Sequence, residues 1–382
     1  MKNFTYYNPT KIVFGTGTER QIGKHIADAG IKKVLLVYGS DRIKKEGLFD
    51  TVADSLAAEG VTCVALGGIV SNPLLSKVYE GIEAAKKEGV EAILAVGGGS
   101  VLDSAKAIAA GACYEGDVWD FFTFKSAIEK ALPVFDVITL AATGSEMNGS
   151  AVVTNDATKQ KFFISTPLLN PKVSVVNPAL QKTVSDAYLV YSASDIIAHS
   201  IEGYFTAAHH PDIISAYVEA NIVTVVKTTE ALLANQDDDD ARGEFAWAAT
   251  QALNGSTAAG VEGAGFPNHM IEHALSALYN VPHGAGLSVV MPAWMKWYVA
   301  QNTPQFERFA RNVFGKTDAR EGIAALEAWF DKIGTPTRLS QFGIGEDAIG
   351  AIAESAHANA HYFGLAETYT ADVIRAILTK AL

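Results

Sequence analysis

The chain has 382 residues, enough for two domains that each have a core. A hydrophobic content of 49% and a charged content of 19% exclude a disordered chain, and a net charge of −12 argues against a nucleic-acid partner. Because the sequence also has only two cysteines, no signal-peptide pattern and no apolar run of about 18 residues, we expect a cytoplasmic protein without a membrane partner.

Strand-like and helix-like segments alternate through the first half of the chain. This alternation is typical of βαβ units and predicts a Rossmann-like α/β fold with a parallel sheet that is covered on both faces. The expected elements are strand 11–15, helix 18–29, strand 32–38, helix 42–59, strand 61–66, helix 74–88, strand 92–96, helix 100–112 and strand 134–140, followed by short strands at 151–154, 161–165 and 173–176.

The character of the sequence changes near residue 185. Long stretches rich in Ala, Leu and Ile continue to the end with few strand signals, which predicts an all-helical domain. Asn177-Pro178 suits a hinge or a boundary. We therefore expect a nucleotide-binding α/β domain over 1–180 and an all-helical domain over 181–382, in which a metal site could lie between packed helices.

A glycine-rich turn follows the strand at 92–96. Gly97, Gly98 and Gly99 leave the strand and Ser100 begins the next helix, so backbone N–H groups at a helix N-terminus could bind a phosphate. Asp103 lies in the first turn, where it could cap the helix or bind a ligand. The pattern is not the G-x-G-x-x-G fingerprint, and a tight connection without a ligand is the alternative interpretation.

A second polar turn follows the strand at 134–140. Thr139, Thr143 and Ser145 offer hydroxyl groups there. The carboxyl ends of parallel strands lie at one edge of a sheet, where ligands of such folds bind. Two suitable loops at one edge favour a nucleotide.

The end of the strand at 32–38 bears on the choice of nucleotide. An acid at this position can bind the ribose diol and repel a 2′-phosphate, whereas an arginine can bind the phosphate. This chain has Asp41 next to Arg42, so the two signals conflict. The cofactor is NAD(H) or NADP(H), and of the two we favour NAD(H).

Two histidine-containing segments are candidates for a metal site. Asp195 and His199 are four residues apart, as are His269 and His273, so each pair lies on one face of its helix. A core helix with satisfied polar groups is the alternative for either pair alone. Together the segments can supply one Asp and three His, a set that suits iron(II) or zinc better than magnesium or calcium.

His283 belongs to this set only if the helix carrying His269 ends before it. A straight helix would place the two about 21 Å apart, too far to share one metal. Pro282 disfavours helical geometry before it, and Gly284 and Gly286 are permissive, so the chain can fold His283 back towards His269.

These motifs resemble the iron-containing (group III) alcohol dehydrogenases, and within them the butanol dehydrogenase branch. The resemblance rests on the segments GGGSVLDSAKAIA, LAATGSEMN, DIIAHSIEGYF and HMIEHALSALYNVPHGAGL, and it extends from Tyr7 to about Gly315. It implies a homodimeric, NAD(P)H-linked alcohol dehydrogenase or aldehyde reductase with iron or zinc, acting on small aliphatic substrates by hydride transfer between the nicotinamide and a metal-held alkoxide or aldehyde. The implied architecture is that of the dehydroquinate synthases.

The resemblance also implies roles for particular residues. His273 falls beside the nicotinamide and the substrate and could relay the alcohol proton. A cofactor-contacting lysine falls on Lys159 or Lys161. One departure concerns the cofactor: relatives resemble GGGS where residues 39–42 read GSDR. The implied metal ligands are Asp195, His199, His269 and His283; the implied pyrophosphate loop is Gly98, Gly99 and Ser100; and the implied nicotinamide-side hydroxyls belong to Thr139, Thr143 and Ser145.

Two other functions fit parts of the pattern. A lyase of the dehydroquinate synthase type would use NAD and zinc, but it would need several Lys or Arg beside the metal, and the ligand segments hold Glu202, Glu262 and Glu272 instead. A non-catalytic NAD(H) sensor would keep the glycine loop without a complete ligand set. The last sixty residues carry no motif with an assignable role.

Overall fold

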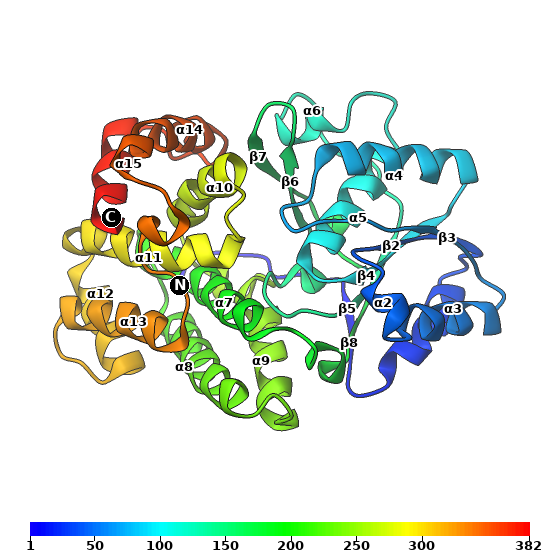
Figure 1. Ribbon diagram of the computed structural model, residues 1–382, viewed down its shortest axis with the longest axis horizontal. Coiled ribbons are helices and arrows are strands. Elements are labelled where there is room, and N and C mark those ends of the chain that lie inside the picture. The colour runs from blue at the N-terminus through cyan, green and yellow to red at the C-terminus, as the bar shows by residue number, and fades with distance from the viewer. The chain divides into compact units, whose positions relative to one another are not determined.

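The computed structural model describes residues 1–382 and divides the chain into two compact units (Figure 1). One unit comprises residues 7–183, and the other comprises residues 1–6 and 184–382. The first six residues belong with the second unit, where the N–H of Lys2 donates to the Gly260 carbonyl at 3.1 Å and its ammonium pairs with Glu262 at 2.7 Å. The boundary expected after residue 180 falls three residues before the one in the structure.

The first unit is built on a six-stranded sheet in which every neighbouring pair is parallel. This confirms the α/β fold class. The strand order is β1-β8-β5-β4-β2-β3. Their bounds are β1 Lys11–Phe14, β2 Lys33–Tyr38, β3 Thr62–Leu66, β4 Ala92–Gly97, β5 Val134–Ile138 and β8 Val173–Val176.

Helices cover both faces of this sheet, and the connections explain why. The chain moves outwards from β2 to β3 through α3 and returns from β3 to β4 through α4. Because crossovers between parallel strands are right-handed in almost all proteins, the opposite directions of these two place α3 and α4 on opposite faces. Alternate residues of the central strands face each helix layer, so these strands are almost wholly apolar, with Asp136 of β5 and Ser174 of β8 as buried exceptions. The helices of this unit are α1 Ile22–Asp28, α2 Arg42–Lys45, α3 Leu48–Ala58, α4 Leu75–Glu88, α5 Gly99–Ala112 and α6 Trp119–Phe122.

Two features differ from the sequence expectation. The single helix expected over 42–59 is two helices, α2 and α3, separated at Gly47, whose φ of 79° lies in the left-handed region that favours glycine. In addition, β6 Ser150–Asn155 and β7 Gln160–Ser165 form a separate antiparallel hairpin rather than part of the six-stranded sheet. Both differences arise from local turns within segments whose type was predicted correctly.

The second unit is helical, as expected from its composition. Its longest helices are buried along much of their length, and polar caps start several of them; Ser185, for example, accepts from the Tyr188 N–H before α7. The helices are α7 Asp186–Thr206, α8 Asp212–Ala234, α9 Asp239–Ala252, α10 Pro267–Tyr279, α11 His283–Tyr298, α12 Thr303–Phe314, α13 Ala319–Ile333, α14 Ile349–Tyr362 and α15 Ala371–Leu378.

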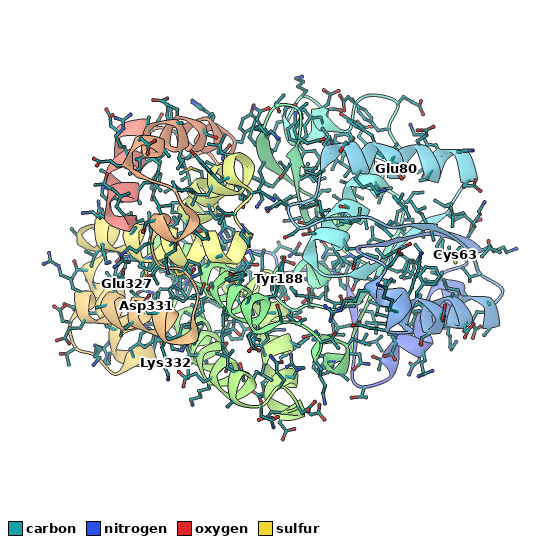
Figure 2. The ribbon with its side chains drawn as sticks, viewed as in Figure 1. Cys63, Glu80, Tyr188, Glu327, Asp331 and Lys332 are labelled. Carbon is teal, nitrogen blue, oxygen red and sulfur yellow. The ribbon has the colours of Figure 1, made fainter.

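Charged side chains on α13 join neighbouring helices at the surface of this unit. Lys332 pairs with Glu230 of α8 at 2.8 Å, and Glu327 pairs with Lys296 of α11 at 2.6 Å; Figure 2 labels Lys332 and Glu327. Such exposed pairs contribute little to stability individually, about 0–1 kcal/mol. The apolar interior therefore holds the helices that carry the site. None of the helices is both long and apolar enough to span a membrane.

Candidate active site

Three helices of the second unit carry the candidate metal ligands. Asp195 and His199 lie one turn apart on α7, in its buried stretch. His269 lies in the first turn of α10, and His283 is the first residue of α11. The two helices are separated by a sharp turn in which Asn280 adopts a φ of 53°, in the left-handed region. The predicted helix break before His283 is therefore present, with Asn280 rather than a glycine in the strained position.

Gly284 and Gly286 serve close packing rather than the turn. Both lie inside α11, and neither has a positive φ. A Cβ on Gly284 would lie 2.0 Å from the Tyr191 carbonyl oxygen of α7, and one on Gly286 would lie 2.8 Å from the Glu272 side chain. The absence of side chains at these positions lets α11 approach α7 and α10 closely enough for His283 to reach the other ligands.

The four candidate ligands converge on one point. Nδ1 of His199, Nε2 of His269 and Nε2 of His283 each lie 3.6 Å from Oδ1 of Asp195. This is longer than a hydrogen bond. In a tetrahedral site with metal–ligand bonds of about 2.1 Å, neighbouring ligand atoms are about 3.4 Å apart. The three distances from Asp195 are therefore close to the edge length of a tetrahedral metal site.

Unpaired buried atoms provide an independent test of whether these residues fit a cation. Oδ1 of Asp195, Nδ1 of His199 and Nε2 of His269 are buried and have no hydrogen-bond partner. Leaving a buried polar atom unpaired costs about 1–3 kcal/mol, so three on neighbouring residues need a common explanation. A divalent cation would satisfy all three, and the donor set of imidazole and one carboxylate suits iron(II) or zinc.

A buried carboxylate on α7 orients His269. Glu202 accepts from the His269 backbone N–H and ring Nδ1, both at 2.9 Å, and from the Asn268 side-chain amide at 3.0 Å. Holding the proton on Nδ1 leaves Nε2, which faces Asp195, available as a ligand. The position of Glu202 one turn after His199 is the sequence signal that predicts such a bond to a metal ligand, and in the structure that ligand is His269.

Glu272 has the same relation to His283. Its carboxylate hydrogen-bonds to Nδ1 of His283 and accepts from the Ser276 hydroxyl, so the Nε2 atom of His283 is directed towards Asp195. Glu272, His273 and His283 also form a compact group of their own. Because the Glu272 oxygens already bind Ser276 and His283, this group orients a ligand rather than forming a second metal cage.

His273 lies beside the four candidate ligands. Its ring centroid is 6.5 Å from that of His269 and 5.7 Å from that of His283. It is buried, and its other ring neighbour is Phe363 at 5.6 Å, edge to face. Phe363 follows α14, which packs on α10, and the Asn359 amide donates to the Met270 carbonyl at 3.3 Å. The last sixty residues thus help to enclose this side of the site.

The carboxylate of Asp195 and the imidazoles around it shift one another's pKa values. Burial raises the pKa of Asp195, but the surrounding histidines outweigh burial and hold this pKa below its ordinary value. Burial lowers the pKa of His199 to about 3 despite the nearby Asp195. Burial also lowers the pKa of His269, but the nearby carboxylates of Asp195 and Glu202 outweigh burial and raise this pKa to about 9. A cation that binds Nε2 of His269 therefore displaces a proton.

The candidate nucleotide loops lie in the first unit, at a point set by the sheet topology. From β2 the chain crosses towards β3, whereas from β4 it crosses in the other direction towards β5. The carboxyl ends of β2 and β4 therefore form a topological switch point, where α/β sheets of this kind bind ligands. Asp41 follows β2, residues 98–100 follow β4, and Thr139 follows β5.

The glycine turn has no room for side chains. A Cβ on Gly97 would lie 2.5 Å from Val101, one on Gly98 3.2 Å from Leu140, and one on Gly99 2.5 Å from Thr143. Gly98 is the extended N-cap of α5, so the first N–H groups of the helix lack partners within the helix. Together with the positive end of the helix dipole, they form a surface that suits a phosphate.

Asp103 and Ser145 are bound to each other. The Ser145 hydroxyl donates to Oδ1 of Asp103 at 2.9 Å, and the other Asp103 oxygen accepts from the Val152 N–H at 3.1 Å. Thr143 accepts from the Ser145 N–H at 3.2 Å. The donor of Ser145 is thus used within the protein, and its contact with a cofactor stays a prediction, as does that of Asp103.

The remaining predicted cofactor residues lie in different surroundings. Asp41 is exposed and pairs with Lys44 at 2.9 Å, while Arg42 donates to Glu46 at 2.7 Å. Lys161 is buried on β7, and its ammonium donates to the Asn72 side chain at 3.1 Å. Thr139 donates its N–H to the Gly97 carbonyl at 3.0 Å, and Ser100 lies in the first turn of α5. Their contacts with a cofactor also stay predictions.

Comparison with known proteins identifies the family. Residues 9–178 match the iron-containing alcohol dehydrogenase family, and residues 189–382 match the C-terminal domain of the Fe-containing alcohol dehydrogenases. The chain belongs to the iron-containing alcohol dehydrogenase family. The resemblance inferred from the motifs is thus confirmed, and with it the enzyme class.

Several relatives of this iron-containing alcohol dehydrogenase are similar over their whole length. It is 39% identical over 390 residues to a probable NADH-dependent butanol dehydrogenase of Bacillus subtilis, covering 100% of both chains. It is 32% identical to an NADPH-dependent aldehyde reductase of Escherichia coli, covering 92% of both. The crystal structure of NADH-dependent butanol dehydrogenase A from Thermotoga maritima is similar with a TM-score of 0.97 at 47% identity, covering 100% of this chain and 99% of that one.

Proposed function

We propose that this chain is a metal-dependent, NAD(P)H-linked alcohol dehydrogenase and aldehyde reductase of the butanol dehydrogenase type. The observation that carries the proposal is the convergence of Asp195, His199, His269 and His283, with three buried atoms that lack partners. The whole-length similarity to butanol dehydrogenases and to an aldehyde reductase supports the reaction class. A lyase or a sensor has no comparable support.

The four converging residues would hold the cation, and the carboxylates of Glu202 and Glu272 would keep two of the histidines in the ligating tautomer. When bound, the metal supplies a Lewis acid and the nicotinamide donates or accepts the hydride. The protein fixes both and excludes water.

His273 would move the proton of the substrate hydroxyl. It lies beside the ligands, and its ring packs against Phe363. An imidazole can accept or donate a proton near neutral pH. Phe363 and Phe266, whose ring is 5.8 Å from that of His269, give the surroundings an aromatic, apolar character. This environment favours a small aliphatic alcohol or aldehyde over a sugar or polyol.

NADH is the cofactor that the local charges favour. Asp41 presents an exposed carboxylate after β2, next to the switch point, where it would repel a 2′-phosphate. Arg42 is engaged by Glu46 and by the Thr183 carbonyl, which reduces its ability to bind that phosphate. The similarity to relatives described as NADH-dependent supports the same preference. We also expect a homodimer that acts in the reducing cytoplasm, in keeping with two free cysteines.

Removal and restoration of the metal test this function. The protein would be stripped with a chelator, then supplied separately with iron(II) or zinc while the oxidation of NADH and NADPH is followed with butyraldehyde. We expect aldehyde reduction to return only with metal and to be faster with NADH. An absence of turnover with either metal, despite tight binding of NADH, would instead support the lyase or the sensor.

A further inference from the structure

Lys106 is a fully buried lysine that sequence analysis did not single out. It lies on α5, seven residues after Gly99, and it is among the largest side chains with no exposed surface. Its ammonium points away from the solvent into the turn that follows β5. It donates to the Ser145 carbonyl at 2.7 Å and hydroxyl at 2.8 Å, to the Asn148 carbonyl at 2.9 Å and side-chain oxygen at 3.3 Å, and to the Ser150 carbonyl at 2.9 Å.

Five oxygens around one ammonium form a specific cage rather than a chance contact. All come from residues 145–150, so a single group on α5 holds almost the whole loop. Internal bonds complete the loop: the Asn148 amide donates to the Gly144 carbonyl at 2.9 Å, and its oxygen accepts from the Ser150 N–H at 2.9 Å. The loop therefore has few ways to close without the lysine.

Charge is essential to this arrangement. Burial lowers the pKa of Lys106 to about 8, while the carboxylates of Asp103, Asp136 and Glu146 act to raise it, so the side chain is mainly protonated at pH 7. A buried ammonium is costly, and an apolar side chain of similar volume often stabilises a fold as well or better. A gain in stability is thus a weak explanation for a lysine at position 106. The need to hold the loop of residues 145–150 in one geometry is a stronger explanation.

The loop that Lys106 holds is in contact with the glycine turn. Thr143 precedes the loop of residues 145–150, and a Cβ on Gly99 would lie only 2.5 Å from its side chain. The Ser145 hydroxyl accepts from Lys106 and donates to Asp103, which lies on the same helix as Lys106. The start of α5 and the turn after β5 are therefore one connected surface. A shift of the turn would change the space available above Gly99.

We propose that Lys106 is a positioning residue that, with Asp103, fixes residues 143–150 against α5 so that the glycine turn and Thr143 form one cofactor-binding surface. The inference rests on the proposed function, because it assumes that this surface binds NADH. It assigns Lys106 no contact with the cofactor. It also explains why the Ser145 donor is used within the protein.

The test compares dissociation constants for NADH, measured by its fluorescence, in purified full-length variants. Lys106→Met removes the donors and keeps the volume, and we expect it to weaken NADH binding about tenfold or more, as the loss of charged hydrogen bonds implies. Lys106→Arg keeps the charge and should recover part of the affinity. Ile108→Val is the matched control: it is fully buried on the same helix, faces Gly81 of α4, and should change NADH affinity less than about twofold.

Amide hydrogen exchange gives a readout that a general loss of stability would not reproduce. In Lys106→Met we expect faster exchange at residues 144–150 and unchanged zinc binding, because the metal ligands belong to the other unit. NADH affinity in Lys106→Met within about twofold of wild type would overturn the proposal, as would an equal loss in Ile108→Val. If Lys106→Met does not fold, Asp103→Asn takes its place in the test. We expect Asp103→Asn to bind NADH more weakly than wild type, and an unchanged NADH affinity would contradict the proposal. Failure of the wild type to bind NADH or NADPH would count against the proposed function itself.

Discussion

Replacing Glu202 by glutamine should weaken metal binding without removing any ligand. The carboxylate accepts from the ring and backbone N–H of His269 and from the amide of Asn268, and it is fully buried. Glutamine has the same shape but only one oxygen. If that oxygen stays on His269, the NH2 group of the new glutamine faces the NH2 group of Asn268. Two donors then face each other until the Asn268 side chain rotates.

The size of the effect follows from what is lost. Oriented carboxylate–histidine–metal arrangements typically lose about 10–100-fold in metal affinity when the outer carboxylate is changed, which is about 1.4–2.7 kcal/mol. We expect Glu202→Gln near the middle of this range. Both hydrogen bonds from His269 go to one oxygen and survive, but the negative charge that makes its Nε2 a stronger ligand is removed.

The assay is competition with a chromophoric chelator for zinc, read as a dissociation constant, with metal content checked by mass spectrometry. Glu219→Gln is the matched control. Glu219 is also a buried carboxylate of the helical unit, but it binds Tyr204, Arg308 and Asn312. Wild-type zinc affinity in Glu202→Gln, or an equal loss in both variants, would refute the orienting role.

Four other variants have distinct expected outcomes. His283→Ala should lose metal and turnover together, whereas His273→Ala should retain metal by mass spectrometry and show a milder loss of turnover that depends on pH. Gly99→Ala should weaken NADH binding about tenfold or more in a fluorescence titration, because its Cβ would lie 2.5 Å from Thr143. Asp136→Asn should be more stable than wild type at pH 8 by denaturant titration, and the difference should shrink towards pH 4. The reason is that burial raises the pKa of Asp136 well above its ordinary value. The stability of the wild type therefore falls as the pH rises from the unfolded pKa of about 3.9 towards the folded pKa.

The following results would contradict the reasoning. Metal retained with full activity in His283→Ala would remove that residue from the ligand set. For Gly99→Ala, the control is Gly350→Ala, where a Cβ meets nothing within 4 Å and the change should be neutral or stabilising; equal effects would show that crowding at the turn is unimportant. A stability difference for Asp136→Asn that does not depend on pH would mean that this carboxyl group does not titrate as its burial implies.

The sequence predicted the fold well because its signals were local. Apolar strands that alternate with amphipathic helices leave few arrangements other than a parallel sheet, and the order of elements was recovered to within a few residues. The split of the expected helix 42–59 was missed because one glycine inside a helical pattern is often tolerated, and only its φ of 79° shows that the chain turns there.

The candidate metal ligands were accessible for a related reason. Spacing of four residues on a helix and a proline before His283 are local features with a clear geometric meaning. The orienting carboxylates and Lys106 depend on contacts between distant segments: Glu202 reaches a residue 67 positions later, and Lys106 reaches residues 39 to 44 positions later. A lone lysine in an apolar helix gives no sign of such partners, since a surface position is the common outcome.

The most direct test of the proposed function is to follow the hydride itself. Metal-restored protein would be given butyraldehyde and NADH that carries deuterium at both C4 positions, and the butanol formed would be analysed by mass spectrometry. We predict a single deuterium on the carbinol carbon, and no labelled product from protein stripped of metal or from His283→Ala. Unlabelled butanol, or equal labelling by the stripped protein, would contradict metal-dependent hydride transfer from the nicotinamide.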